Sequence, residues 1–183
     1  YLLERDWLAV QEEEQVKITK PKIGIMVEVP SVLLQIAEFS ELVDFFSVGS
    51  NDLTQYLLAV DRNNPHVANV YSHFHPAVLR ALQRLVQDCI ENQKPVSICG
   101  EMAGDPLTAI LLMAMGFNTL SMSSSNILRV RKAICHVPMA DAKKLLNEVL
   151  QMNNPLLIKS WLEHYFRTHG LGDMVKSNRL VNA

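Results

Sequence analysis

A single stretch of the sequence, residues 43–62, most constrains what the chain can fold into. It runs from a largely apolar segment at 43–48, through a short polar turn that contains Gly49, into a segment whose apolar residues have helical spacing. This order predicts a β-strand that leads into a helix through a tight turn, which is half of a βαβ unit. Because apolar residues occupy odd and even positions of the strand, we expect both of its faces to be buried, as in a parallel sheet.

The turn of this unit is the first candidate for function. Gly49 lets the backbone turn without the steric penalty of a Cβ atom. Asn51 and Asp52 follow it, where they can cap the helix and place polar groups beyond the carboxyl end of the strand. In parallel α/β folds, ligands and catalytic groups gather at this end of the strands. We therefore expect Asn51 and Asp52 to lie at the functional edge of the sheet.

The rest of the chain repeats the same alternation of strand and helix. Three more strands are predicted, at 23–29, 96–99 and 119–122. Further helices are predicted at 32–42, 76–92, 106–115, 127–135, 139–151 and 155–168. Strands that alternate with helices predict right-handed crossover connections and a parallel sheet.

Polar residues lie at the carboxyl end of every predicted strand, and this distinguishes two kinds of parallel fold. They are Glu28, Asn51 with Asp52, Cys99 with Gly100 and Glu101, and the segment 121–123. An open doubly wound sheet recruits two neighbouring loops at one crevice, whereas a barrel recruits the loops of all its strands. The sequence therefore favours an α/β fold that is part of a (β/α)8 TIM barrel.

The composition excludes several classes of function. Among 183 residues, 17 basic and 19 acidic side chains are intermingled, and the net charge is -2. This balance predicts neither a nucleic-acid surface nor a polybasic membrane patch, and no apolar stretch approaches the length of a membrane span. The three cysteines, Cys89, Cys99 and Cys135, are odd in number and lack metal-binding spacing. They predict reduced thiols and a cytoplasmic protein.

The beginning of the sequence predicts a helix and suggests a larger parent protein. Leu3, Trp7 and Val10 have helical spacing, so we expect a leading helix that packs this stripe of side chains. The chain lacks an initiator methionine, and we expect it to be a piece of something longer. The predicted parts of the single domain 1–183 are a leading helix at 1–20, βα units at 21–151, a terminal helix at 152–170 and a tail at 171–183.

Five segments of the chain carry a resemblance to one known family. They are GIMVEVPS at 24–31, DFFSVGSNDLTQY at 44–56, AVDR at 59–62, CGEMAGD at 99–105 and LSMS at 120–123. In order and register, from about residue 20 to 150, they resemble the signatures of phosphoenolpyruvate (PEP)-utilising enzymes. Within that family the chain is most similar to the enzyme I group of the bacterial phosphotransferase system. The ending GLGDMV at 170–175 is more similar to the nitrogen-related branch of that group than to the sugar branch.

The resemblance implies the C-terminal half of a PEP-binding barrel. It implies a kinase-type transferase that binds PEP and Mg²⁺, moves the phosphoryl group to a histidine on an upstream domain and releases pyruvate. A phosphocarrier protein would be the partner of the missing N-terminal domain. The family's upstream arginines and first barrel strands are absent from this sequence, so we expect no turnover by the chain alone. Half a barrel also has unpaired strand edges, which favours a homodimer.

Glu28 and Asp52 are the candidate metal ligands. Two carboxylates at neighbouring strand ends can supply part of an octahedral oxygen shell and leave the rest to water and substrate, as Mg²⁺ prefers. On spacing alone, the alternatives to a metal site are a salt bridge for Glu28 and a helix cap for Asp52. The resemblance assigns both residues to Mg²⁺.

The resemblance also assigns Asn51, Asp52 and Arg62 to substrate binding and Cys99 to catalysis. An amide at a helix N-terminus suits a phosphate, and a guanidinium offers it a planar, bidentate fork. Cys99 resembles the residue that protonates carbon 3 of the enolate as pyruvate forms. Without the surrounding motifs, the alternatives are a plain cap for Asn51, a solvated loop arginine for Arg62 and an inert packing thiol for Cys99.

Three hypotheses for function stay open at this point. The first is the PEP-binding portion of an enzyme I. The second is another PEP-utilising enzyme, such as a dikinase, a synthase or a Mg²⁺-enolate lyase, of which the lyase would not need Cys99. The third is a non-catalytic module for oligomerisation. The six histidines are expected to be structural or exposed under all three, since none lies in a Gly-rich, Ser-His motif.

Overall fold

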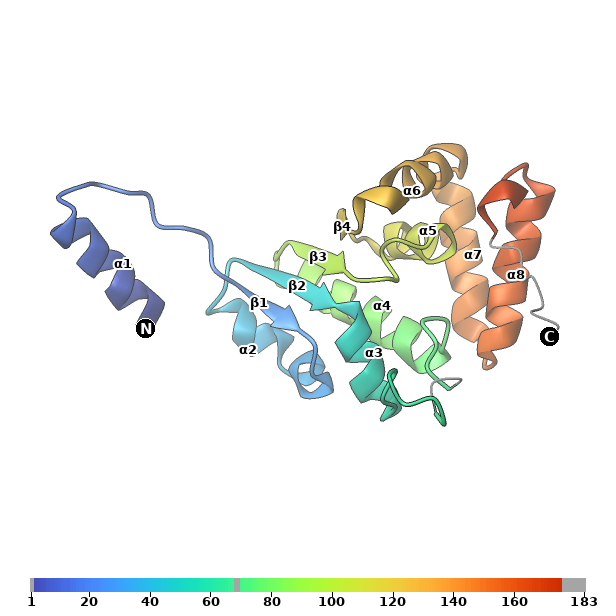
Figure 1. Ribbon diagram of the computed structural model, residues 1–183, viewed down its shortest axis with the longest axis horizontal. Coiled ribbons are helices and arrows are strands. Elements are labelled where there is room, and N and C mark those ends of the chain that lie inside the picture. The colour runs from blue at the N-terminus through green and yellow to red at the C-terminus, as the bar shows by residue number, and fades with distance from the viewer. Residues whose placement is uncertain (1, 68–69, 176–183) are drawn as a thin grey trace.

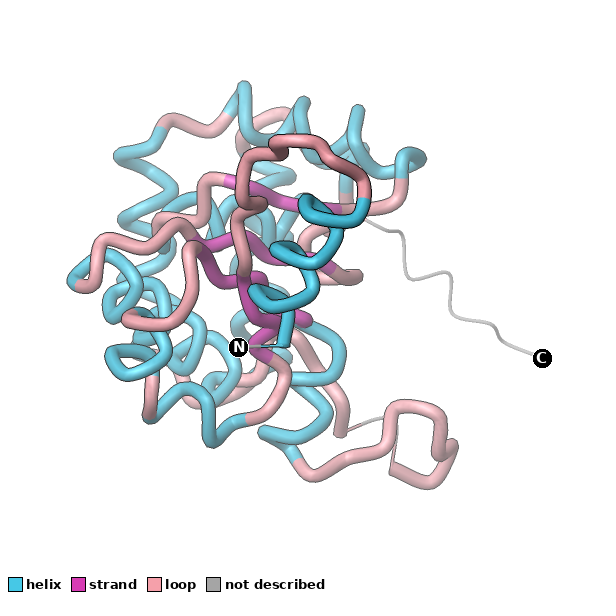
Figure 2. The backbone as a smooth tube through the Cα atoms, turned by 90° about the vertical axis from the view of Figure 1, so that its left-hand side faces the viewer, coloured by secondary structure: helices cyan, strands magenta, loops and turns pink. Residues whose placement is uncertain are grey.

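Four parallel strands form the centre of the molecule. Figure 1 shows the computed structural model, which describes residues 2–67 and 70–175. The strands are β1 (Gly24–Val27), β2 (Phe45–Gly49), β3 (Val96–Cys99) and β4 (Thr119–Ser121). They make one parallel sheet in the order β1-β2-β3-β4, and each overlaps its predicted segment. The α/β class and the parallel sheet are confirmed. The strands cross the middle of Figure 2 and twist relative to one another.

The described residues also form eight α-helices and two short 3₁₀ helices. They are α1 (Leu2–Glu13), η1 (Pro30–Leu34), α2 (Ile36–Ser40), α3 (Ser50–Leu58), α4 (Pro76–Glu91), α5 (Pro106–Met115), α6 (Ser124–His136), α7 (Met139–Gln151), α8 (Pro155–Thr168) and η2 (Gly172–Met174). The single helix predicted at 32–42 is wrong in detail. Gln35 has a non-helical backbone (φ -134°, ψ 23°), and it separates η1 from α2.

Helix termini follow local sequence signals. The Asp105 side chain accepts a hydrogen bond from the backbone N–H of Leu107 (2.9 Å), and Pro106 occupies the first turn of α5. Gly116 ends the same helix in the left-handed conformation at φ 115°. The Asn154 side chain caps α8 in the same way as Asp105 caps α5. These signals were readable in the sequence, and the predicted α4, α5, α7 and α8 match the structure closely.

One face of the sheet forms the core. Val27, Val48 and Ile98 lie side by side in register, and all three are fully buried. Their face is covered by helices because consecutive strand order sends every right-handed crossover to the same side. Behind the sheet, α5 is buried almost all round, since α6, α7 and α8 pack on it as a second helical layer.

The opposite face of the sheet is not covered by helices in the part of the chain that the structure describes. Met26, Ser47, Ser97 and Thr119 form a row across it, and Met26 is 48% exposed. The prediction that the strands at 23–29 and 43–48 are buried on both faces is therefore wrong here. Apolar residues at both odd and even positions of a strand do not indicate which face of the sheet the connecting helices will leave uncovered.

The leading helix α1 stands apart from the rest of the fold (Figure 1). None of its residues is buried, and Leu3 is 65% exposed. Lys20 pairs with Glu4 (2.7 Å) and joins the helix to its own linker. The prediction that α1 packs a stripe of side chains is wrong for the described residues, because no apolar surface of the fold faces it. The part of the predicted tail at 176–183 lies outside the described residues.

No described helix is both long enough and apolar enough to cross a membrane.

Neighbouring residues of β2 test the difference between the two faces. Phe46 is fully buried on the covered face, whereas Phe45 is partly buried on the open face, where its ring lies over Gly24. We expect Phe46→Ala to lower the free energy of unfolding by about 3–5 kcal/mol, measured by urea denaturation, and Phe45→Ala to lower it by less than half as much. Equal losses would show that both faces are covered in solution.

Candidate functional site

The carboxyl ends of β1, β2 and β3 bring two candidate residues into one row. The Glu28 carboxyl follows β1 and lies over Gly49 at the end of β2: a Cβ atom on Gly49 would be 2.5 Å from Glu28 Oε1. Gly49 pairs in register with Cys99 on β3, and Cys99 pairs with Ser121 on β4. The missing side chain at Gly49 therefore makes room for a carboxylate beside the thiol, on the open face of the sheet.

Cys99 lies within the electrostatic reach of both candidate metal ligands. Burial raises the pKa of its thiol most, and the negative charge of Glu28 raises it further. A backbone hydrogen bond opposes these effects, and the charge of Asp52 raises the pKa by a smaller amount. Its Sγ donates to the Val48 carbonyl oxygen at 3.4 Å. The thiol therefore keeps its proton at neutral pH, and the structure places the Glu28 carboxyl over the register neighbour of Cys99.

The first turn of α3 carries two of the candidates, but it does not use them as caps. Helix α3 begins at Ser50, and its N-cap is Gly49, which has no side-chain capping bond. The prediction that Asn51 and Asp52 cap this helix is wrong, because both lie within its first turn. The Asn51 side-chain oxygen instead accepts a hydrogen bond from the backbone N–H of Glu101 at 3.2 Å. Asp52 lies in the same turn, and among the described residues its side chain makes no capping hydrogen bond to this helix.

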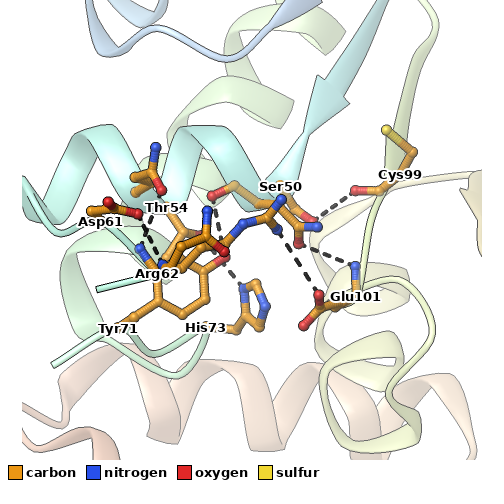
Figure 3. Close-up of polar contacts among 11 residues, drawn as sticks. Ser50, Thr54, Asp61, Arg62, Tyr71, His73, Cys99 and Glu101 are labelled. Carbon is orange, nitrogen blue, oxygen red and sulfur yellow. Dashed lines mark hydrogen bonds and ion pairs between the residues drawn. The ribbon is translucent and has the colours of Figure 1, made fainter. Parts of the chain in front are cut away.

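The turn after β3 is fixed to the start of α3. The Ser50 hydroxyl donates to the Cys99 carbonyl oxygen at 2.7 Å (Figure 3). Gly100 follows with φ 106°, and a Cβ atom there would collide with Ser50 Oγ and lie 3.0 Å from Asn51 Oδ1. Both the backbone angle and the space exclude a side chain at Gly100. This junction sets the distance between the thiol and the N-terminus of α3.

Arg62 reaches the same edge from the connection between α3 and α4. Ala59 ends α3 in the left-handed conformation (φ 52°), and the Arg62 backbone N–H then donates to Gln55 Oε1 at 3.2 Å. Its guanidinium Nη1 lies 3.9 Å from Glu101 Oε1 (Figure 3). This ion pair contributes little to stability because the Glu101 side chain is 74% exposed. The guanidinium is therefore available to an anion.

The sequence did not single out Tyr71, and it left His73 as structural or exposed. The Tyr71 hydroxyl donates to the Asn51 carbonyl oxygen at 3.1 Å, and its ring meets the His73 ring edge-on at 5.2 Å. Burial lowers the pKa of His73 below its usual value, although the charges of Glu101 and Asp105 oppose this, so the ring is neutral at pH 7. Only their place in the loop after Arg62 could have drawn attention to them.

The edge of the sheet is hollowed next to these groups. A groove of about 320 Å³ is lined by Asn51, Cys99, Gly100, Glu101, Ser121, Met122, Ser123 and Asn126. Two larger hollows, of about 380 and 720 Å³, lie on the other side of Glu101 and share His73 and Lys159. The smaller groove is the better candidate for chemistry because the thiol and Asn51 line it, whereas neither lines the larger two.

The carboxylate pair suits a metal that needs few protein ligands. Among residues 2–67 and 70–175, no three His, Cys, Asp or Glu side chains converge as a metal cage. Mg²⁺ does not require one, since it keeps several waters and binds through one or two carboxylates together with substrate oxygens. The space above Gly49, filled by the Glu28 carboxyl, and the uncapped Asp52 fit that pattern.

Residues 2–139, which include all of these groups, match the sequence family described as PEP-utilising enzyme, PEP-binding domain. The chain belongs to the PEP-utilising enzyme family. The predicted resemblance is thereby confirmed at the level of the family and of its PEP-binding domain.

Individual relatives of this PEP-utilising chain are phosphotransferases by name. It is 38% identical over 175 residues to the "phosphoenolpyruvate-dependent phosphotransferase system" protein of Salmonella typhimurium, covering 96% of the chain and 23% of that protein. It is 37% identical over 144 residues to the phosphoenolpyruvate-protein phosphotransferase of Borreliella burgdorferi, covering 79% and 25%. Multiphosphoryl transfer protein 1 of Escherichia coli is 42% identical over 140 residues, covering 76% and 17%. The chain thus spans about a quarter or less of the length of these relatives, and its similarity to the enzyme I group is confirmed.

The junction between β3 and α3 can be tested with two glycines. Gly100 and Gly170 both have positive φ, but a Cβ atom would meet nothing within 4 Å at Gly170. We expect Gly170→Ala to cost about 1 kcal/mol from the backbone conformation alone. Gly100→Ala should cost clearly more in the free energy of unfolding in urea, because Ser50 must also move. Equal costs would show that the Ser50 side chain has room to relax.

The charge effect on Cys99 predicts a pH dependence of its reactivity. In a Cys135→Ser background, the rate of alkylation by iodoacetamide should follow the Cys99 thiolate, since buried Cys89 has a pKa of about 12. The midpoint should lie above that of a free cysteine. Glu28→Gln removes a negative charge that disfavours the thiolate, so it should lower the midpoint. Glu91→Gln, on the exposed end of α4, is the control and should leave the midpoint unchanged; an unshifted midpoint in Glu28→Gln would place Glu28 away from the thiol.

Proposed function

We propose that this chain is the PEP-binding part of a phosphoenolpyruvate-protein phosphotransferase. The observation that carries the proposal is the position of the Glu28 carboxyl over Gly49, the register neighbour of Cys99, in a chain that belongs to the PEP-utilising family. The names of the relatives support phosphotransfer rather than a dikinase or lyase reaction.

Arg62 and Asn51 are proposed to bind the phosphate of PEP. Arg62 lies at the open edge beside Glu101, and Asn51 lies in the first turn of α3, where backbone N–H groups and the helix dipole favour an anion. A guanidinium matches phosphate oxygens in a bidentate geometry. An incoming phosphate would compete with the weak, exposed contact to Glu101, so binding requires the loss of little interaction energy.

Glu28 and Asp52 are proposed to hold Mg²⁺. The ion, when bound, would neutralise negative charge on the substrate phosphate and carboxylate oxygens. Glu28 lies over Gly49, the register neighbour of Cys99, which keeps this proposed ligand close to the group that would protonate the enolate. Asp52 follows Asn51 directly, so the metal side and the phosphate side of the site share the first turn of α3.

Cys99 is proposed to donate the proton that completes pyruvate. When the bond between the phosphorus and the enol oxygen of PEP breaks, the phosphoryl group passes to the acceptor histidine, and the electron pair stays on the enolate. Carbon 3 then takes a proton from Cys99 Sγ, which leaves pyruvate and a thiolate that is reprotonated from solvent. Burial and the two carboxylates raise the pKa of the thiol, so it holds a proton before each turnover.

The architecture supports a larger assembly. Consecutive strand order, helices on one face only and unpaired outer edges of β1 and β4 are features of part of a (β/α)8 barrel. We propose that the chain is such a part, that a second copy covers its open edges in a homodimer, and that the parent protein is cytoplasmic. The acceptor histidine, the phosphocarrier partner and turnover would then belong to a longer protein, of the nitrogen-related branch.

Calorimetry with PEP and MgCl₂ tests the proposed site. The chain should bind PEP with Mg²⁺ and release no pyruvate. Arg62→Ala should weaken PEP binding by about tenfold to a hundredfold, the cost of a charge-assisted contact, and Glu28→Gln should abolish the dependence on Mg²⁺. Cys99→Ala should bind normally, because the thiol acts only on the enolate.

Arg84→Ala and Glu91→Gln, both on exposed positions of α4, are the matched controls. Absence of heat with the unmodified chain, or equal effects of Arg62→Ala and Arg84→Ala, would refute the proposed phosphate site. Loss of PEP binding in Cys99→Ala would instead show that the thiol takes part in binding.

A further inference from the structure

One face of α3 holds the loop that carries Arg62. Thr54 and Gln55 lie one helical turn after Asn51, on the same face of the helix. The Asn51 carbonyl oxygen accepts from the Tyr71 hydroxyl (3.1 Å), and Gln55 Oε1 accepts from the Arg62 N–H (3.2 Å). The Thr54 hydroxyl lies 3.5 Å from His73 Nδ1. The loop is therefore anchored near both of its ends by polar groups of a single helix.

Tyr71 is the link between the two residues proposed to bind phosphate. Its hydroxyl donates to the backbone of Asn51 at 3.1 Å. Burial raises the pKa of Tyr71 most; the positive charge of Arg62 lowers it, and the charge of Glu101 raises it. Figure 3 shows the Arg62 side chain extended between Tyr71 and Glu101. A hydroxyl that donates to Asn51 still has lone pairs that can accept a hydrogen bond from a neighbouring guanidinium.

The Tyr71 ring is held in place from behind. His73 meets it edge-on at 5.2 Å and is itself largely buried, and Phe74, next in the chain, belongs to the hydrophobic core. A ring that is fixed on one side by packing and on the other by a hydrogen bond has little freedom to move. Its hydroxyl therefore has a defined position and can orient the longer, partly exposed side chain of Arg62.

We propose that Tyr71 is a positioning residue that holds the Arg62 guanidinium at a set distance from Asn51, so that both meet the same phosphate. The proposal rests on the proposed function of Arg62 and Asn51. It assigns Tyr71 no contact with substrate: the residue acts through Arg62. Glu101, on the other side of the guanidinium, is the exposed partner that phosphate replaces, whereas Tyr71 stays in place.

Tyr71→Phe tests the proposal because it keeps the ring and removes only the hydroxyl. Tyr56→Phe on α3 is the matched control, since Tyr56 is 57% exposed. In the unliganded protein, amide hydrogen exchange at Arg62 should become faster in Tyr71→Phe, because the loop loses an anchor, and should not change in Tyr56→Phe. With PEP and Mg²⁺, calorimetry should show about threefold to tenfold weaker binding in Tyr71→Phe, the worth of one hydrogen bond, and no change in Tyr56→Phe.

A double-mutant cycle separates positioning from a general effect on the fold. In an Arg62→Ala background, Tyr71→Phe should cause no further loss of PEP affinity, because there is no guanidinium left to position. Additive losses would overturn the proposal, as would unchanged exchange at Arg62, or a Tyr71→Phe chain that fails to fold. If the unmodified chain does not bind PEP, the proposed function fails, and the exchange measurement still decides whether Tyr71 anchors Arg62.

Discussion

Consecutive order of the parallel strands is the constraint on which the rest of this structure depends. Because each right-handed crossover moves to the next strand, the helices that connect the strands are placed on one face, and all strand carboxyl ends meet at one edge. The covered face becomes the core around Val27, Val48 and Ile98. The open face keeps smaller and polar residues, and its last row holds Glu28 over Gly49 and beside Cys99. Fold and site therefore arise from the same topological rule.

Two glycines at strand ends make room for the polar groups of the candidate site. Gly49 leaves the space that the Glu28 carboxyl fills, and Gly100 leaves the space that Ser50 and Asn51 fill. In each case the absence of a side chain lets a polar group from a neighbouring element approach the end of a strand. Burial, and after it the charge of Glu28, raises the pKa of the Cys99 thiol and keeps it protonated, which is the state that a proton donor to an enolate needs. The absence of a side chain at these two glycines therefore influences the environment of the thiol.

The residues proposed to form the phosphate side of the site are held differently from those proposed to form the metal side. Glu28, Asp52 and Cys99 are fixed by the sheet and the first turn of α3, whereas Arg62 belongs to a long loop. That loop is held by polar groups on one face of α3 and by the Tyr71 hydroxyl. A rigid metal side and an anchored but partly exposed arginine suit a substrate that must enter and leave. Membership of the PEP-utilising family gives this arrangement its proposed substrate.

The sequence by itself determined the alternation of strands and helices, the parallel sheet, the helix caps at Asp105 and Asn154 and, through its motifs, the family. These depend on residues close together in the chain, so local patterns carry them. Only the tertiary structure decided that one face of the sheet stays open, that α1 packs against nothing in the described fold, and that Asn51 bonds to the turn at Glu101 instead of capping α3. It also brought Tyr71 to Arg62. Such facts depend on which distant segments meet, and neither hydrophobic period nor spacing along the chain contains that information.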